Sequence, residues 1–275
     1  MKSASEYRAQ ARKALEGKWG EAVLASVCML VIGLIFMGPG QAIMMCIDKH
    51  LIIPEWGFLG GGCYIGYLLV GVPASFGFSI AFLRLLRGSK ETVVCDLANA
   101  ATGNWWRSIG VTLLVGLMAG IIGIAVCVVA FPLAGITIYL TLPEGIDISM
   151  IGENPLLIGG IGLCAFVLAY FALLVAVMVY ALAVSMTYYI MEDHPEMGLR
   201  DAIRASRKMM KGHKWQLFCL EFSFIGWALV CVLTAGIGIL WVAPYEYAAI
   251  AAFYEDLNPK PAEDVEVVEV EVVEA

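Results

Sequence analysis

Charged residues are scarce in this sequence. Only 15% of its 275 residues are Asp, Glu, Lys or Arg, while 61% are hydrophobic and the mean hydropathy is +0.84. Soluble domains carry about a quarter charged residues, because their surfaces face water. The deficit excludes an ordinary soluble fold. It predicts an all-α, polytopic transmembrane helical bundle, in which each helix satisfies its own backbone polar groups within the lipid.

Motifs for catalysis and for metal binding are also missing. The histidines His50, His194 and His213 are far apart, and none belongs to an H-E-x-x-H motif or a Cys/His cluster. No G-x-S-x-G motif, Walker loop or dinucleotide-binding glycine motif occurs in a suitable context. The eight cysteines include no C-x-x-C pair, and only Cys46 and Cys63 flank a loop where they could pair. We therefore expect no catalytic residue, metal site, cofactor or enzymatic activity, and no nucleic-acid partner.

Long apolar runs are abundant instead. Four of them are long enough to cross the ~30 Å hydrocarbon core as helices, at about 22–47, 57–86, 109–131 and 156–190. The last run, 217–254, exceeds one span and is interrupted at 235–238 by Ala-Gly-Ile-Gly. We predict a hairpin of two short helices there, about 215–233 and 239–257, which gives six spans. The alternative is five spans, with the last one ending near Trp241.

Glycine and proline within these runs predict local features. The triplet Gly38-Pro39-Gly40 predicts a bend or an early end of the first helix. In the second run, Gly62 and Gly66 have a small-xxx-small spacing, which is typical of closely packed helices. Loose packing softened by glycine is the alternative interpretation.

Lys and Arg residues are distributed unevenly along the chain. With six spans and a cytoplasmic N-terminus, all of the 17 except Lys49 fall in inner segments, which makes 16 inside. The positive-inside rule therefore predicts that both ends of the chain are cytoplasmic. Five spans would move Lys260 outside as well, so charge hardly separates the two alternatives. Tryptophans at the ends of the runs are predicted interface anchors: Trp19, Trp105, Trp106 and Trp215.

A basic amphipathic helix is predicted just before the last apolar run. Between Leu199 and His213, apolar and small residues recur at intervals of three and four, which predicts one buried face. Six bases occupy the other faces: Arg200, Arg204, Arg207, Lys208, Lys211 and Lys214. They are candidate contacts for anionic lipid headgroups, and the alternative is a solvated face that only sets the topology. The lipid bilayer, with its anionic headgroups, is thus the expected partner, and the sequence does not identify any protein partner.

Two acidic residues within the last apolar run are candidate intramembrane polar residues. Glu221 lies about 9 Å past Trp215 along a helix, so its carboxylate could reach back and pair with Lys211 or Lys214; burial for a function is the alternative. Glu246 lies about 10 Å inside the last predicted helix, close to Pro244. Two interpretations of Glu246 remain open: a hydrogen bond that packs helices together, or a role in ion or proton transport.

The two ends of the chain differ in character. Residues 2–20 predict a short amphipathic helix on the membrane surface, and we expect no cleaved signal peptide. We expect one membrane-embedded helical domain at 1–258 and a disordered acidic tail at 259–275. In the tail, valine alternates with acidic residues, and the like charges on one face oppose strand pairing.

Two blocks of this sequence resemble a known bacterial family of integral membrane proteins. They are ARKALEGKWGEAVL at 11–24 and SRKMMKGHKWQLFCLEFSFIGW at 206–227, the latter followed by GILWVAPY at 238–245 and AAFYEDL at 251–257. These segments resemble the family known as domain of unknown function 975. The resemblance implies a polytopic protein of the bacterial cytoplasmic membrane with a cytoplasmic amphipathic helix, and it assigns no activity.

The function expected from all of this is non-enzymatic. We expect a scaffold or a lipid-contacting component of the cell envelope. The alternative is a small transporter or channel, in which helices broken at 38–40 and 235–238 accompany an intramembrane carboxylate, Glu246.

Overall fold

The computed structural model describes residues 2–49, 56–141 and 155–258. Within these ranges, all regular structure is helical and five helices are long and apolar enough to cross a membrane. They cover Trp19–Asp48, Gly57–Leu86, Trp105–Ala125, Tyr170–Asp193 and Lys214–Leu233. The predicted all-α, polytopic membrane fold is confirmed. The predicted acidic tail at 259–275 lies outside the described residues.

The chain divides into two compact units. The first consists of Met1–Thr112 and Ser185–Ala275, and the second of Leu113–Val184. Whether 1–258 behaves as the single embedded domain expected from the sequence stays a prediction. All of the candidate intramembrane and lipid-contacting residues belong to the first unit.

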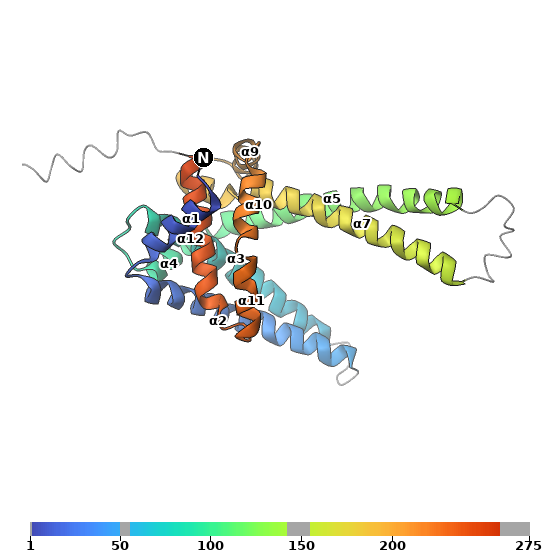
Figure 1. Cartoon of the computed structure of the whole chain (residues 1–275). Coiled ribbons are helices and arrows are strands. Elements are labelled where there is room, and N and C mark those ends of the chain that lie inside the picture. Colours follow the sequence, from blue (N-terminus) through green and yellow to red (C-terminus); the bar gives the residue numbers. More distant parts are fainter. Residues whose placement is uncertain (1, 50–55, 142–154, 259–275) are drawn as a thin grey trace, which may run out of the picture. The chain divides into compact units, whose positions relative to one another are not determined.

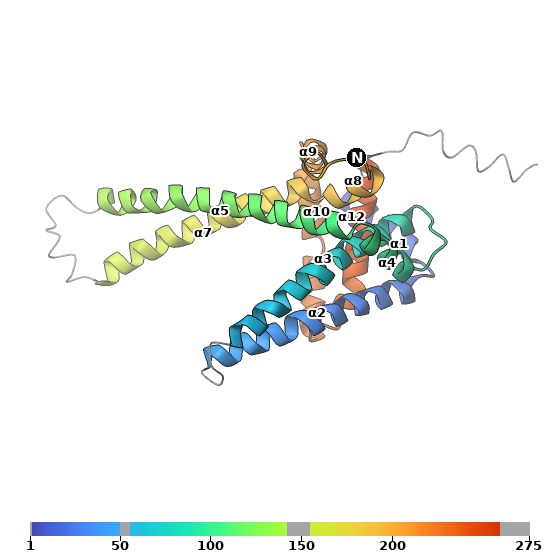
Figure 2. The same cartoon turned by 180° about the vertical axis from the view of Figure 1, so that it is seen from behind.

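In the first unit, α2 (Trp19–Asp48) and α3 (Gly57–Leu86) form an antiparallel hairpin (Figures 1 and 2). Helix α2 continues through Pro39, so the early end expected at 38–40 is wrong. Membrane helices tolerate proline where a neighbouring helix packs closely. Here α3 approaches so closely that a Cβ added to Gly40 would lie 3.3 Å from the Cβ of Cys63. Gly66 similarly faces the ring of Phe36, whereas a Cβ on Gly62 would meet open space.

Helix α1 (Ala4–Leu15) packs mainly on α12 (Ile239–Leu257). Its apolar face of Tyr7, Ala11 and Leu15 is at most 2% exposed. The ring of Tyr7 meets that of Phe253 edge-on at 5.3 Å, and its hydroxyl donates to the Asp256 carboxylate at 2.8 Å. The amphipathic helix predicted for the N-terminus therefore exists, but the protein itself covers its apolar face.

The last apolar run folds as the predicted hairpin. Helices α10 (Lys214–Phe222) and α11 (Ile225–Leu233) lead to a turn, after which α12 runs back beside them (Figure 1). Ala235 and Gly236 in the turn have left-handed φ values of 50° and 90°, a conformation that suits glycine. The Thr234 hydroxyl accepts a hydrogen bond from the Gly238 backbone N–H at 2.9 Å, so the turn satisfies some of its own polar groups.

Whether α12 crosses the membrane is not settled by its length. Its 19 residues span about 28 Å at 1.5 Å per residue. It carries Glu246, Glu255 and Asp256 and is not among the five helices that qualify by length and composition within the described ranges. The count of six spans thus stays a prediction.

Three shorter helices join the long ones. Helix α4 (Val93–Gly103) packs on α3. Thr92 caps its N-terminus, where the Thr92 side chain accepts a hydrogen bond from the Cys95 N–H. Helices α8 (Thr187–Asp193) and α9 (Leu199–Met209) pack on each other. Gly212, with a φ of 91°, separates α9 from α10.

The second unit is a pair of long helices. Helix α5 (Trp105–Thr141) enters it from the first unit, and α7 (Pro155–Val184) returns. A Cβ on Gly123 would lie 3.6 Å from the Leu173 side chain, which shows that the two helices are in contact there. The span expected at 156–190 is not one continuous helix, because α7 ends at Val184 and α8 begins at Thr187.

Candidate functional site

A cavity of about 640 Å³ lies within the first unit, between α2, α3, α10, α11 and α12. Small-molecule sites in proteins are typically about 300 to 1,000 Å³. Most of the residues around the cavity are apolar or aromatic, but Glu221 of α10 and Glu246 of α12 also line it. The structure therefore brings both of the predicted intramembrane carboxylates to one site, although 25 positions separate them in the sequence (246 minus 221).

The two carboxylates have no cationic partner in the part of the chain that the structure describes. No Lys, Arg or His is among the described residues that line the cavity. The alternative pairing of Glu221 with Lys211 or Lys214 is not formed, since the ion pairs among the described residues do not include Glu221. Glu221 and Glu246 instead share the lining of one cavity.

Aromatic rings form much of the remaining wall. Tyr67 and Phe78 come from α3, Tyr247 comes from α12, and Phe224 precedes α11. The rings of Phe78 and Tyr247 meet edge-on at 4.9 Å, and Phe78 and Phe224 are each only 4% exposed. Because these rings are held by packing, the wall is preformed.

Glu221 lies beside a helix break, and Glu246 lies beside a proline inside a continuous helix. Helix α10 ends at Phe222 and α11 starts at Ile225, so the helix is broken immediately after Glu221. Pro244 lies two residues before Glu246 inside α12. Proline has no N–H, so the carbonyl of Leu240, another cavity residue, loses its usual helical donor. Broken helices with free backbone acceptors occur at ion and substrate sites in membrane proteins.

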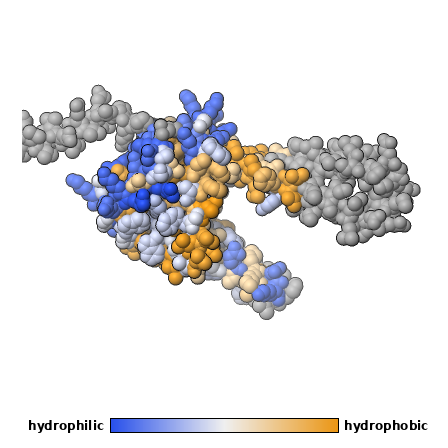
Figure 3. Space-filling view, viewed as in Figure 1, coloured by the Kyte–Doolittle hydropathy of each residue, from blue (hydrophilic) through white to orange (hydrophobic). Residues whose placement is uncertain are grey.

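The opening of the cavity is apolar. Leu30, Ile225 and Ile239 line it and remain 45%, 55% and 50% exposed. Figure 3 shows hydrophobic surface over the region of α11, whereas hydrophilic surface gathers where α1, α4 and α9 lie. In a bilayer, exposed side chains of this kind face the hydrocarbon. The cavity therefore opens on an apolar surface of the first unit.

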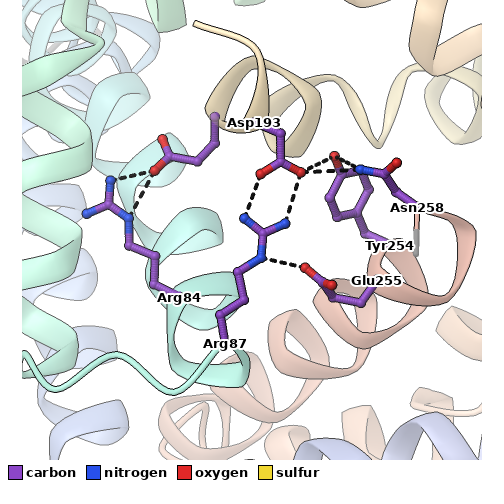
Figure 4. Close-up of polar contacts among 7 residues, drawn as sticks. Arg84, Arg87, Asp193, Tyr254, Glu255 and Asn258 are labelled. Carbon is purple, nitrogen blue, oxygen red and sulfur yellow. Dashed lines mark hydrogen bonds and ion pairs between the residues drawn. The ribbon is translucent and has the colours of Figure 1, made fainter. Parts of the chain in front are cut away.

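A polar cluster fixes the ends of the helices at the hydrophilic end of the unit (Figure 4). We use this name for Arg84, Arg87, Asp96, Glu192, Asp193, Tyr254, Glu255 and Asn258. The side chain of Arg84 contacts Glu192 at 3.0 Å through Nε and Asp96 at 3.4 Å through Nη1. It thereby joins the end of α3 to α8 and α4.

Arg87 is the centre of this cluster. Its Nη1 and Nη2 donate to the two oxygens of Asp193 at 2.6 and 2.9 Å, and its Nε donates to Glu255 at 2.6 Å. Burial lowers the pKa of Arg87, but the hydrogen bonds and charges of Asp193 and Glu255 outweigh it, so the net shift is upward and the group stays charged. Tyr254 donates to Asp193 at 2.7 Å, which ties α12 to α8 as well.

The six bases of the predicted amphipathic helix lie on or just after α9. The apolar face is buried as predicted, with Ala202, Ile203 and Met210 at most 3% exposed. The bases Arg200, Arg204, Arg207, Lys208 and Lys211 are exposed and Lys214 is half-buried. Of these six bases, only Arg204 forms an ion pair with a described residue, at 3.1 Å with Asp201, and both of these side chains are largely exposed.

The predicted interface anchors differ in their surroundings. Trp106 and Trp215 are each 72% exposed, as side chains in contact with headgroups would be. Trp105 stacks on Trp106 at 5.3 Å, and its ring N–H donates to the backbone carbonyl of Leu69. Trp19 packs near Tyr245 at 6.4 Å. Trp105 and Trp19 thus also have packing roles inside the first unit.

Sequence reasoning missed the polar cluster and the aromatic wall. Arg84 and Arg87 were visible only as positive charges at the end of a span, and Glu192, Asp193 and Glu255 lie at the ends of other helices. The signal that could have revealed the cluster was the shared position of these residues at the ends of predicted spans, because charged side chains at the same membrane face can pair. No group of three or more His, Cys, Asp or Glu side chains in the described ranges is arranged to hold a metal ion.

The chain matches one family model, described as "Protein of unknown function (DUF975)", over residues 1–260. The chain belongs to the DUF975 family. No curated protein and no solved structure matches it. Membership in DUF975 agrees with the resemblance seen in the sequence and with a multi-pass membrane fold, and it assigns no activity.

Proposed function

We propose that this protein is a non-enzymatic, lipid-contacting component of the bacterial cytoplasmic membrane, acting as a scaffold in the envelope. The observation that carries the proposal is the surface of α9, which buries its apolar face and presents bases outward. Each Lys or Arg near an anionic membrane surface contributes about 1 kcal/mol of attraction. Exposed bases that are not engaged by acidic side chains are available for such contacts.

The arrangement of the helix ends supports a six-span topology with both ends in the cytoplasm. Helix α1 packs on α12, and the cluster around Arg87 joins the ends of α3, α8 and α12. Groups that contact one another directly lie on the same side of a bilayer. With α12 returning to the side of α1, the number of crossings is even, and the positive-inside rule makes that side cytoplasmic.

Lipid selectivity of the purified full-length protein tests the proposal. In nanodiscs of mixed phosphatidylcholine and phosphatidylglycerol, the wild type should enrich phosphatidylglycerol around itself, as measured by quantifying co-purified lipid. Replacing Arg200, Arg207, Lys208 and Lys211 with Gln should remove most of this enrichment, and raising the salt concentration should weaken it because the contacts are exposed.

The matched control replaces four exposed bases outside α9, namely Arg12, Lys13, Lys49 and Lys90, with Gln. This variant carries the same change of charge and should retain most of the enrichment. Equal loss in both variants would show that net charge alone attracts the lipid, and it would defeat the assignment to α9.

A small transporter is the second candidate function, and the cavity between α2, α3 and α10–α12 favours it. Intramembrane carboxylates beside a helix break, as at Glu221, or beside a proline, as at Glu246, occur at the coupling sites of transporters. Glu246→Gln should abolish flux through proteoliposomes while the thermal unfolding curve stays unchanged. Unchanged flux in this variant would rule out a coupling role for Glu246.

A further inference from the structure

The cavity lined by Glu221 and Glu246 has an unbalanced electrostatic environment. Two carboxylates face a mostly apolar space, and the described lining supplies no positive charge. Both side chains are only partly exposed, and an ionised carboxylate that has lost part of its water without gaining a cationic partner is destabilised. A bound positive charge between the two would offset that cost.

The wall suits an organic cation better than a bare metal ion. Tyr67, Phe78, Phe224 and Tyr247 surround the space, and aromatic faces attract ammonium and similar cations. A metal ion that has lost its water would instead need several oxygen ligands from the protein. Two carboxylates on separate helices, with apolar neighbours, do not supply such a set.

The position of the site indicates how a ligand enters. Glu221 lies about 10 Å from the start of α10 and Glu246 lies about 16 Å from the end of α12, so both are well inside the apolar segments. The cavity residues Leu30, Ile225 and Ile239 are exposed, and exposed apolar side chains of a membrane-spanning segment face the hydrocarbon. A ligand that reaches this opening is dissolved in the bilayer and is therefore lipophilic.

We propose that this cavity binds a lipophilic organic cation, with its charge between Glu221 and Glu246 and its apolar part against the aromatic wall. The cavity of about 640 Å³ accommodates a molecule of several rings. The site does not depend on lipid contact by α9 and goes beyond the scaffold role. It defines the substrate class of the transporter candidate, but binding does not require transport.

Equilibrium binding of radiolabelled tetraphenylphosphonium tests the proposal. This probe carries a permanent positive charge inside an apolar shell. The full-length protein is placed in nanodiscs of neutral phosphatidylcholine, so that no anionic lipid attracts the probe. The wild type should bind it saturably. Glu221→Gln and Glu246→Gln should each weaken binding about tenfold, which corresponds to about 1.4 kcal/mol.

Three controls keep the result specific. Tetraphenylborate, of the same shape but opposite charge, should not compete. Glu16→Gln, at an exposed position outside the cavity, should bind as the wild type does. Ala243→Phe adds a ring to the cavity while both carboxylates stay, and it should reduce binding even though the charge is unchanged.

The outcomes separate this proposal from the others. Absence of saturable binding to the wild type, equal competition by tetraphenylborate, or full binding by the Glu221→Gln/Glu246→Gln double variant would each overturn it. Lipid enrichment by α9 can succeed or fail independently, because it is measured with a different ligand and different variants.

Discussion

Arg87 joins the end of α3 to two other helices in the polar cluster. It is 22% exposed and contacts Asp193 on α8 and Glu255 on α12. Removing one partner of this half-buried group leaves the remaining charges only partly compensated. Arg87→Ala should therefore lower the free energy of unfolding by about 2 kcal/mol, between the effects of an exposed and a fully buried pair, measured as thermal unfolding in detergent by tryptophan fluorescence.

Arg204→Ala is the matched control for Arg87. Its pair with Asp201 is 76% and 62% exposed, and exposed pairs contribute less than about 1 kcal/mol. A loss at Arg87 no larger than the loss at Arg204 would mean that the cluster does not hold the helix ends together.

Tyr7 gives the protein a predictable response to alkaline pH. Burial, followed by the hydrogen bond to Asp256, raises the pKa of Tyr7 above its ordinary value of 10.0. Above about pH 10 the unfolded chain therefore loses this proton while the folded protein keeps it, and the free energy of unfolding falls as pH rises. The stabilisation from Tyr7 is fully present below that pH.

Tyr7→Phe should accordingly cost about 1 to 2 kcal/mol at neutral pH, and its difference from the wild type should shrink above about pH 10. Unfolding curves measured from pH 7 to pH 11 report both effects. Tyr245→Phe is the control, because the Tyr245 hydroxyl has no hydrogen bond among the described residues. A pH-independent gap for Tyr7→Phe would contradict the expectation.

At the scale of elements, the contact between α3 and α4 depends on one glycine. A Cβ at Gly77 would clash with the backbone carbonyl oxygen of Leu97, and backbone cannot move away as the end of a flexible side chain can. Gly77→Ala should therefore destabilise the protein by about 2 kcal/mol or more, read from the melting temperature in detergent. In the same helix, Gly62→Ala meets open space and should have little effect or stabilise slightly.

The sequence predicted the elements better than their contacts. The hairpin of α10–α11 and α12 was predictable because Gly236 and Gly238 interrupt an apolar run that is too long for one span. The basic helix α9 was predictable from its three-and-four periodicity. The continuity of α2 through Pro39 was not, because it depends on the close approach of α3 at Gly40, and only tertiary packing determines that contact.

The candidate site was predictable only in part, for a related reason. Glu221 and Glu246 stood out as charges in an apolar run, so their identity was available from the sequence. Their meeting in one cavity was not, because it requires the turn at 234–238 to bring α12 back beside α10 and α2 and α3 to close the other side. The aromatic residues Tyr67 and Tyr247 gave no signal among 11 tyrosines.

At the scale of the whole molecule, the topology is open to a direct measurement. Single cysteines at Ile237 and at Asn258, in a background without the native cysteines, can be labelled in intact cells with a membrane-impermeant thiol reagent. Six spans with cytoplasmic ends place Ile237 outside, where it should be labelled, and Asn258 inside, where it should be protected. Labelling of Asn258 would contradict the even number of crossings.

The packing of α1 on α12 also orders events during synthesis. Tyr7 and Asp256 are separated by 249 positions, so α1 leaves the ribosome long before its main partner exists. Until Phe253 and Asp256 have been made, the apolar stripe of α1 has little of its own protein to cover it. Docking of α1 is therefore a late step of assembly, and a chain truncated before Phe253 exposes that stripe to the chaperones and proteases that monitor membrane proteins.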